Sequence, residues 1–533
     1  MNAEGTPVRS LDGAGRSLVL AAVAVCGAAV MEVEVLGARM VGPWFGVSLF
    51  VWTALITVTL LSLALGYYLG GRLADARGSL RLLGGLVVLA GLLLLAVPFL
   101  RVPVLKASLQ AGLRGGALLA ALLLFAPCLT VLGTVTPFAV RLYIRDMRET
   151  GRTVGRLSAL STLGSFLGTV TTGFWLIPAF HVDQIASGSA FVLLLLGSTL
   201  LAWSLRMPAL LLVAVPALGG FPAPPLGRAT LPDGTLAELV HRRGSFYGQV
   251  SVADYRFGSR HHREMLIDGI VQGGVDATNG LSIYPNTYVM ETVARQRHPA
   301  AQRALVIGLG PGLVVNRFAD LGMGGTVVDI DSRVVSVARD WFGFREGPFR
   351  VEIADGRTFL GATEQRFDVV LLDAFSAEME PANLVTREAF EGIRRLLNPG
   401  GLFLINTSAF TPGPGFENPA LDSMLRTLDA VFPGAEAFFY PTRTEPGTPR
   451  GNVLVAQLPG AAAGGGASLR ALPVHEFAQG GLEGLFGNRY LPAPGSGIVL
   501  TDAYAPLESM NAAYKLTWRR ETLANTPPEI LLN

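Results

Sequence analysis

The chain has 533 residues, of which 50% are hydrophobic and only 15% charged. An ordinary soluble domain carries about 25% charged residues, so the composition excludes a disordered chain, a fibrous protein and a wholly soluble enzyme. The net charge of +2 gives no reason to expect nucleic-acid binding. The charge is divided unevenly: residues 1–222 carry 15 basic and 8 acidic side chains, and the remainder carries 27 and 32. This division predicts a membrane domain joined to a soluble domain.

Six apolar runs in the first part are long enough to cross a bilayer, whose ~30 Å core needs about 20 helical residues. They lie near residues 18–38, 46–70, 82–100, 116–140, 157–179 and 184–205. A seventh run, at 207–221, contains two prolines, and as a helix it would reach only about 22 Å. We therefore expect six spans followed by a short interfacial or re-entrant segment, with seven spans as the alternative.

The basic residues between the runs predict the orientation. Arginines gather after the second run and after the fourth run, at positions 72, 77 and 81 and at positions 141, 145, 148, 152 and 156. Because positive loops face the cytoplasm, we expect a multi-pass protein of the inner cell membrane whose N-terminus and soluble half are cytoplasmic. Arg101, Lys106 and Arg114, after the third run, oppose this pattern.

Polar and small residues within the runs have competing interpretations. Glu32 and Glu34 lie in the first run, where a carboxylate is costly and is a functional candidate by default. They either form a proton or amine site facing the bundle, or serve a structural pairing, for example with Arg39, or lie near the membrane interface. Gly164 and Gly168 form a GxxxG pattern that predicts close helix packing. The two cysteines of the chain show no metal-ligand spacing, and we expect no metal site.

The soluble half begins with a strand pattern. Residues 247–271 alternate as strands do, and the dipeptide Asp268-Gly269 is a turn signal. We expect a small antiparallel β subdomain over 223–300, with a helix near 285–297, and a Rossmann-like domain over 301–533.

The most informative pattern starts with a short buried strand at 304–307. A glycine-rich loop at 308–312 (GLGPG), a helix at 313–321 and a strand at 326–330 follow. Asp329 comes 21 residues after Gly308, which is the spacing at which a carboxylate binds the hydroxyls of a ribose. Pro311 crowds the turn, and Leu313 stands where a third glycine would be. These two departures disfavour a dinucleotide with its pyrophosphate and favour a nucleoside without phosphates.

Two further carboxylates follow predicted strands. Asp355 comes after the strand near 351–353, where it would receive an adenine amino group, and Asp373 ends the buried strand 367–372. Ligands bind beyond the carboxyl ends of the strands in open α/β sheets, so we expect Asp329, Asp355 and Asp373 to converge, with Asp373 nearest the chemistry. The alternative for each acid taken singly is a helix N-cap.

Several of these segments together resemble one family. They are residues 266–272 (LIDGIVQ), 305–312 (LVIGLGPG), 327–331 (VVDID), 354–359 (ADGRTF) and 371–376 (LLDAFS). They are similar to the spermidine/spermine synthases, the polyamine aminopropyltransferases, and residues 46–53, 65–75 and 500–508 are similar to the membrane-fused branch of that family. The resemblance implies a class I S-adenosylmethionine-binding fold, a two-fold homodimer and a polyamine-like amine as acceptor.

The resemblance also assigns roles to residues. The donor would be S-adenosylmethionine or its decarboxylated form, leaving S-adenosylhomocysteine or methylthioadenosine, with no metal. Asp373 would be the catalytic residue that accepts a proton from the attacking amine or orients it. The donor nucleoside would contact Gly308, Gly310, Gly312, Asp329, Asp331, Asp355 and Gly356. The donor tail and the acceptor would contact Gln272, Tyr284, Tyr288 and Ser376.

Two departures from the family bear on the reaction. Pro311 and Ser376 replace carboxylates that the family uses to hold cations, and Glu378 and Glu380 are expected to be loop charges rather than replacements. Methyl transfer is slightly favoured, because ordinary S-adenosylmethionine carries its own carboxylate beside the ammonium. True aminopropyl transfer is the first alternative. A non-catalytic module that senses a nucleoside or polyamine, and a transporter whose main function lies in the membrane half, are the others.

Overall fold

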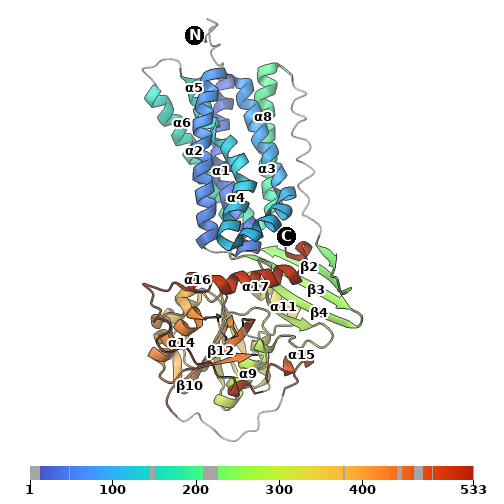
Figure 1. Ribbon diagram of the computed structural model, residues 1–533, viewed down its shortest axis with the longest axis vertical. Coiled ribbons are helices and arrows are strands. Elements are labelled where there is room, and N and C mark those ends of the chain that lie inside the picture. The colour runs from blue at the N-terminus through green and yellow to red at the C-terminus, as the bar shows by residue number, and fades with distance from the viewer. Residues whose placement is uncertain are drawn as a thin grey trace. The chain divides into compact units, whose positions relative to one another are not determined.

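The structure is a computed structural model, and it describes most of the chain. The described residues are 13–46, 49–144, 150–207, 226–375, 379–411, 413, 415–440, 447–460, 472–482 and 484–531. Contacts divide the chain into a helical unit, Met1–Pro225, and an α/β unit, Leu226–Asn533. Figure 1 shows the first as a bundle of long helices and the second as sheets covered by helices.

Within its described residues the helical unit holds six helices that are long and apolar enough to cross a membrane. Three of them are α1 (Gly13–Phe45), α2 (Leu49–Arg77) and α8 (Val182–Leu205). The other three are composite: α3 (Leu80–Ser108) with η1 (Leu109–Ala111), α4 (Gly112–Gly133) with α5 (Val135–Tyr143), and α6 (Thr150–Thr171) with η3 (Thr172–Leu176) and α7 (Ile177–Ala179). The six predicted helical runs are thus confirmed as helices. The seventh run lies, apart from Met207, outside the described residues.

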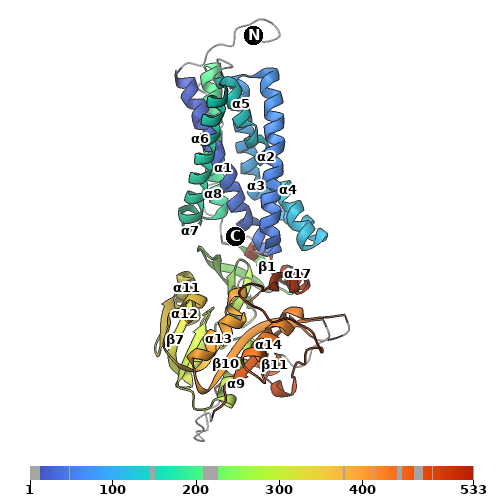
Figure 2. The same cartoon turned by 90° about the vertical axis from the view of Figure 1, so that its left-hand side faces the viewer.

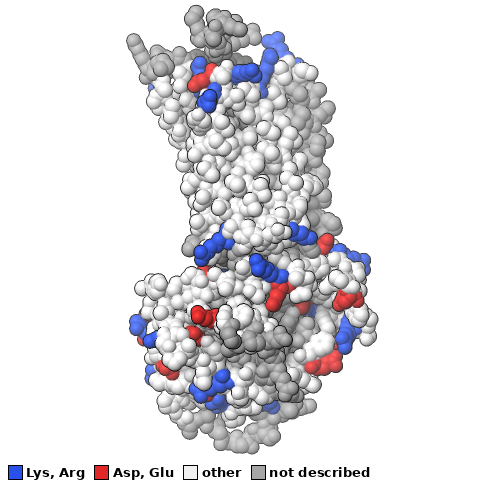
Figure 3. All heavy atoms as spheres, viewed as in Figure 1, with Lys and Arg blue, Asp and Glu red and all other residues white. Residues whose placement is uncertain are grey.

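Contacts between the helices show how the bundle is ordered. Helix α1 packs mainly on α6, α2 on α4, and α3 on α8. Arg141 of α5 pairs with Asp75 of α2 at 3.4 Å, and Arg16 of α1 lies over the ring of Tyr143. The start of α1 and the ends of α2 and α5 therefore share one end of the bundle. Figure 3 shows the viewed face of this unit without charge along its middle and with Lys and Arg at its upper end.

The two glycines of the GxxxG pattern lie against α1. A Cβ on Gly164 would sit 2.1 Å from the carbonyl oxygen of Ala24, and one on Gly168 would sit 2.5 Å from that of Ala28. Any side chain at either position would force the two backbones apart. The pattern is therefore a packing device within the bundle.

Ionisable residues of the bundle have partners on other helices. The buried carboxylate of Glu32 accepts a hydrogen bond from the Ser189 hydroxyl of α8. Arg101 of α3 pairs with Asp183 at the start of α8 at 3.2 Å. The second pair gives Arg101, which opposes the charge pattern of the loops, a structural role inside the α3–α8 contact.

The α/β unit begins with a five-stranded antiparallel sheet. Its strands, in spatial as in chain order, are β1 (Arg228–Thr230), β2 (Leu236–Gly244), β3 (Gln249–Phe257), β4 (Arg260–Ile267) and β5 (Ile270–Asp276). Asp268 and Gly269 have φ values of +48° and +77°, which is the conformation of a two-residue hairpin turn. Helix α9 (Pro285–Arg297) follows. The antiparallel strands, the turn and the helix agree with the sequence prediction.

The second sheet has seven strands in the order β11-β12-β10-β9-β6-β7-β8. Their bounds are β6 (Arg303–Ile307), β7 (Gly324–Asp329), β8 (Phe349–Ile353), β9 (Phe367–Leu372), β10 (Leu397–Phe410), β11 (Glu436–Tyr440) and β12 (Pro449–Gln457). The five strands from β8 to β10 are parallel, whereas β12 runs antiparallel to both β10 and β11. The order along the chain reverses at β6: β7 and β8 follow on one side of it, and β9 and β10 lie on the other side. Rossmann-like folds show the same reversal. The predicted Rossmann-like architecture is therefore present.

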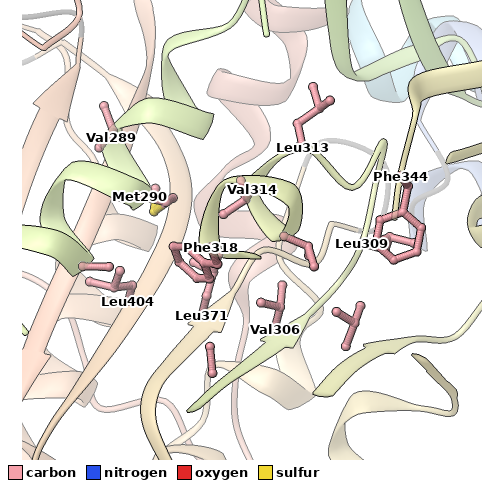
Figure 4. Close-up of a cluster of buried hydrophobic side chains, with 14 of the residues drawn as sticks. Val289, Met290, Val306, Leu309, Leu313, Val314, Phe318, Phe344, Leu371 and Leu404 are labelled. Carbon is pink, nitrogen blue, oxygen red and sulfur yellow. The ribbon is translucent and has the colours of Figure 1, made fainter. Parts of the chain in front are cut away.

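Helices cover both faces of this sheet because neighbouring strand residues point to opposite sides. Val306 and Leu371 belong to the core shared with α9, α10 (Leu313–Asp320) and α11 (Ser332–Phe342), shown in Figure 4. Ile307 and Leu372, one residue further along, belong to the core shared with α12 (Gly356–Ala362), α13 (Arg387–Leu396) and α14 (Pro419–Val431). Figure 2 shows these three helices along the sheet.

Short helices complete the α/β unit. They are η5 (Ala382–Leu384), α15 (Glu476–Gln479), η6 (Leu485–Gly487), α16 (Leu507–Met510), α17 (Ala512–Asn525) and α18 (Pro528–Leu531). Helix α18 closes the β subdomain, since Ile530 is buried with Ala237, Leu239, Ala253 and Leu266. Helix α17 presents three buried side chains, Tyr514, Lys515 and Arg519.

Candidate active site at the carboxyl end of the sheet

The glycine-rich loop holds the end of β6 against the end of β9. Gly308, Gly310 and Gly312 have φ values of +92°, +51° and +77°, a region that residues with a Cβ seldom adopt. A Cβ on Gly308 would lie 2.2 Å from the carbonyl oxygen of Asp373. The amide of Asp373 in turn donates to the carbonyl of Ile307 at 2.8 Å. The backbone of the glycine-rich loop therefore lies directly against the backbone of Asp373.

Asp329 connects the same loop to the end of β7. One carboxylate oxygen accepts from the amide of Leu309 at 2.9 Å and the other from the amide of Asp331 at 2.8 Å. Burial raises the pKa of Asp329 to about 6. Each oxygen keeps a second lone pair, so the carboxylate can still accept hydrogen bonds from two ribose hydroxyls.

Asp331 and Asp355 are both helix caps. The Asp331 carboxylate accepts from the amide of Arg333 at 2.9 Å at the start of α11. Oδ1 of Asp355 accepts from both the amide and the hydroxyl of Thr358, at 2.8 and 3.0 Å, at the start of α12. The predicted alternative of an N-cap thus holds for Asp355, and a role of Asp355 toward adenine would have to use its other oxygen. Gly356 lies beside the end of β6, since its Cβ would meet Ile307 at 2.8 Å.

A chain of hydrogen bonds orients the carboxylate of Asp373. Nδ2 of Asn406 on β10 donates to Asp373 at 2.7 Å, and the Tyr440 hydroxyl on β11 donates to the Asn406 carbonyl oxygen. Burial raises the pKa of Asp373, and the Asn406 hydrogen bond partly opposes this. A buried carboxylate of raised pKa beside a glycine-rich loop is suited to general-base chemistry.

The β4–β5 hairpin closely approaches the glycine-rich loop. A Cβ on Gly273 would lie 2.8 Å from the ring of Pro311, and one on Gly310 would lie 3.6 Å from the carbonyl oxygen of Gln272. The Gln272 side chain donates to the carbonyl of Ile270 at 3.3 Å. The ring of Pro311 therefore leaves no room for a side chain at Gly273 of the hairpin.

The two predicted tyrosines are engaged within the fold. The Tyr284 hydroxyl donates to the carboxylate of Glu264 on β4. The Tyr288 hydroxyl donates to the carbonyl of Ser282 at 2.8 Å, and its ring lies 4.7 Å from the guanidinium carbon of Arg317. Their predicted contacts with donor tail and acceptor stay predictions.

Glu380 is a buried side chain and not a loop charge, which corrects the sequence expectation. It is 4% exposed, and its pKa is raised to about 7, chiefly by burial and also by the charge of Asp373. A hydrogen bond with Thr407 and the charge of Lys515 act in the opposite direction. Sequence pattern gave no sign of this, nor of Asn406 and Tyr440, because nothing in a local pattern relates them to Asp373.

Ser376 and Glu378 lie outside the described residues. Among the described residues no group of three metal-ligating side chains comes together.

Comparison with known proteins identifies the domain that carries these residues. Residues 286–457 match the family model of the spermine/spermidine synthase domain, so the C-terminal part of the chain carries a domain of this family. A probable polyamine aminopropyl transferase of Bifidobacterium longum is 31% identical over 134 residues, which are 25% of this chain and 29% of that protein. A polyamine aminopropyltransferase of Escherichia coli O1:K1 / APEC is 33% identical over 175 residues, 31% of this chain and 57% of that protein.

These similarities concern part of each protein. The chain spans less than two thirds of the length of the two relatives. Among solved structures, a probable spermidine synthase from Corynebacterium glutamicum ATCC 13032 is 19% identical, with a TM-score of 0.35 over 41% of this chain and 79% of that one.

Proposed function

We propose that the chain is a membrane-anchored transferase that moves an alkyl group from an S-adenosyl sulfonium donor to a polyamine-like amine. The observation that carries the proposal is the pairing of two acids around one loop. Asp329 bonds to the backbone of the glycine-rich loop, and Asp373, oriented by Asn406, lies against the backbone of Gly308. The carboxylate proposed to bind the ribose and the carboxylate proposed to act as the base thus lie at the same sheet edge.

The residues of this edge suit the transfer of an alkyl group to an amine. An alkylammonium with a pKa above about 10 must lose a proton before its nitrogen can attack. A buried Asp373 of raised pKa is a better acceptor for that proton than an exposed carboxylate. The amine nitrogen then forms a bond to the carbon on sulfur, the carbon–sulfur bond breaks, and a neutral thioether nucleoside leaves.

Aminopropyl transfer is the first candidate, because the relatives are named polyamine aminopropyltransferases. Buried Glu380 also weakens one of the two arguments for methyl transfer, since a carboxylate is still present near Asp373. Methyl transfer is the second candidate. It is favoured by Pro311, which stands where the resemblance expects an acid for the ammonium of the decarboxylated donor and which lies close to Gly273.

The membrane part of the proposal rests on the six long apolar helices. At 1.5 Å per residue the shortest of them, with 24 residues, spans about 36 Å, enough for a ~30 Å core. Six crossings, with Arg-rich loops inside, would return the chain to the cytoplasmic side. The predicted boundaries at 222 and 300, the bilayer as partner and the two-fold homodimer stay predictions.

Product mass separates the candidates. The full-length protein in detergent is incubated with a polyamine mixture and either S-adenosylmethionine or its decarboxylated form. A product heavier by one methylene means methyl transfer, and one heavier by an aminopropyl unit means aminopropyl transfer. Asp373→Asn should lower the turnover rate at least 100-fold. Calorimetry should show that the affinity for methylthioadenosine is unchanged. Nucleoside binding without turnover on any amine would instead support a sensing module.

A further inference from the structure

Glu32 is a buried carboxylate of the helical bundle that has no basic partner. It lies on α1, is 8% exposed, and accepts a hydrogen bond from the Ser189 hydroxyl of α8. The two ion pairs between described residues of the bundle are made by Arg101 and Arg141 with other carboxylates. A carboxylate inside a membrane span is costly and marks a functional site by default. Glu32 therefore needs a proton or a cation that these arginines do not supply.

A second buried polar group of the bundle, the hydroxyl of Thr172, has no hydrogen-bond partner within the described residues. The side chain is fully buried. Threonine in a helix usually bonds to the carbonyl of the preceding turn, as is the case at Thr162, Thr169, Thr171 and Thr199. Thr172 instead begins η3, a π-helical turn, and such turns are frequent at functional sites. The helix itself therefore does not account for this hydroxyl.

The register of α1 against α6 brings Thr172 beside Glu32. The two glycines of the GxxxG pattern lie against Ala24 and then Ala28, so the two helices run in the same direction and advance together by four residues. The next step of four pairs Glu32 with Thr172. Helix α1 contacts α6, η3 and α8, and Figure 2 shows these helices on one side of the bundle. Three helices thus supply one carboxylate and two hydroxyls to the same place.

We propose that Glu32, Ser189 and Thr172 bind a primary ammonium group inside the bundle. Such a group has three N–H donors, which match the three side-chain oxygens, and its hydrogen bond to the carboxylate is charge-assisted. Ca²⁺ and Mg²⁺ take about six oxygen ligands, more than these side chains provide. The inference rests on the membrane part of the proposed function and not on the transfer reaction. The helical unit is then a binding domain for cationic amines as well as an anchor.

Chemical protection of Glu32 gives a readout confined to the bundle. The full-length protein in lipid nanodiscs is treated with dicyclohexylcarbodiimide, a membrane-soluble reagent that adds to protonated carboxyl groups. Mass spectrometry of peptides then measures the labelling rates of Glu32 and of Glu34, a half-buried residue of the same helix. Propylamine hydrochloride at about ten times its Kd should slow the labelling of Glu32 about 10-fold and leave that of Glu34 unchanged. The neutral 1-propanol should protect neither.

Two neighbouring threonines provide a matched pair of variants. Thr172→Val removes the unpartnered hydroxyl and keeps the shape of the side chain. It should raise the propylamine concentration that halves the labelling of Glu32 about 10-fold, because a hydrogen bond to a charged group is lost. Thr171→Val removes a hydroxyl that bonds to the carbonyl of Leu167 within its own helix. It should leave the protection of Glu32 as in the wild type.

Three results would overturn the inference. They are labelling of Glu32 that propylamine does not slow, equal protection by 1-propanol, and a Thr172→Val protein that behaves as Thr171→Val does. The outcome is separable from that of the transfer assay. If no amine accepts a group from either donor while propylamine still protects Glu32, the proposed transferase fails and the ammonium site in the bundle stands.

Discussion

Gly308→Ala tests whether the glycine-rich loop positions Asp373. A Cβ at this position would lie 2.2 Å from the Asp373 carbonyl oxygen, about 1 Å closer than the ~3.3 Å at which carbon and oxygen normally meet. The φ of +92° adds backbone strain of about 1–2 kcal/mol. The Asp373 backbone must therefore retreat by about 1 Å, and a displacement of that size can lower turnover about 100-fold.

The assay measures transfer by product mass and stability by thermal unfolding of the full-length protein in detergent. We expect kcat to fall about 100-fold. The melting temperature of Gly308→Ala should fall as well, because both the backbone strain and the clash with Asp373 lower the stability of the folded protein.

A matched control separates the clash from the strain. Gly343, the residue after α11, has a φ of +66°, and a Cβ there would have nothing within 4 Å. Gly343→Ala should therefore cost only the backbone strain and leave kcat near the wild-type value. Wild-type kcat in Gly308→Ala, or an equal loss in Gly343→Ala, would refute the idea that the loop fixes the position of Asp373.

Three further predictions concern Asp329, Asp355 and Gly164. Asp329 must be ionised to accept hydrogen bonds from two ribose hydroxyls, and it has a pKa of about 6. The affinity for methylthioadenosine should therefore fall as the pH drops through 6. Calorimetry at pH 5 and pH 8 checks this, and equal affinity at both would contradict it. Asp355→Ser keeps a capping hydroxyl whereas Asp355→Ala loses about 1 kcal/mol of stability; if the serine variant binds the nucleoside as the wild type does, Asp355 is only a cap. Gly164→Leu should separate α1 from α6 and lower the melting temperature in detergent well beyond the effect of Gly173→Leu, whose Cβ would meet nothing within 4 Å.

The sequence predicted the parts of the site that rest on local pattern. Residues 304–330 form a strand, the glycine-rich loop, a helix and a second strand. Short connections bring the end of the second strand, and with it Asp329, beside the loop. The dipeptide at 268–269 predicted the hairpin turn for the same local reason, and the apolar runs predicted the six long helices. All of these features were found.

Tertiary structure decided which of the acidic side chains are engaged in local structure and which are buried with Asp373. Asp331 and Asp355 cap helices, while Glu380, expected to be a loop charge, is buried in the same polar cluster as Asp373. The difference arises because burial depends on what packs against a residue. In this chain those partners, Asn406, Tyr440 and Lys515, come from strands and a helix far along the sequence. The sequence by itself therefore determined the glycine-rich loop with Asp329 and the apolar helices, and only the packing of distant elements decided which other acidic side chains are buried.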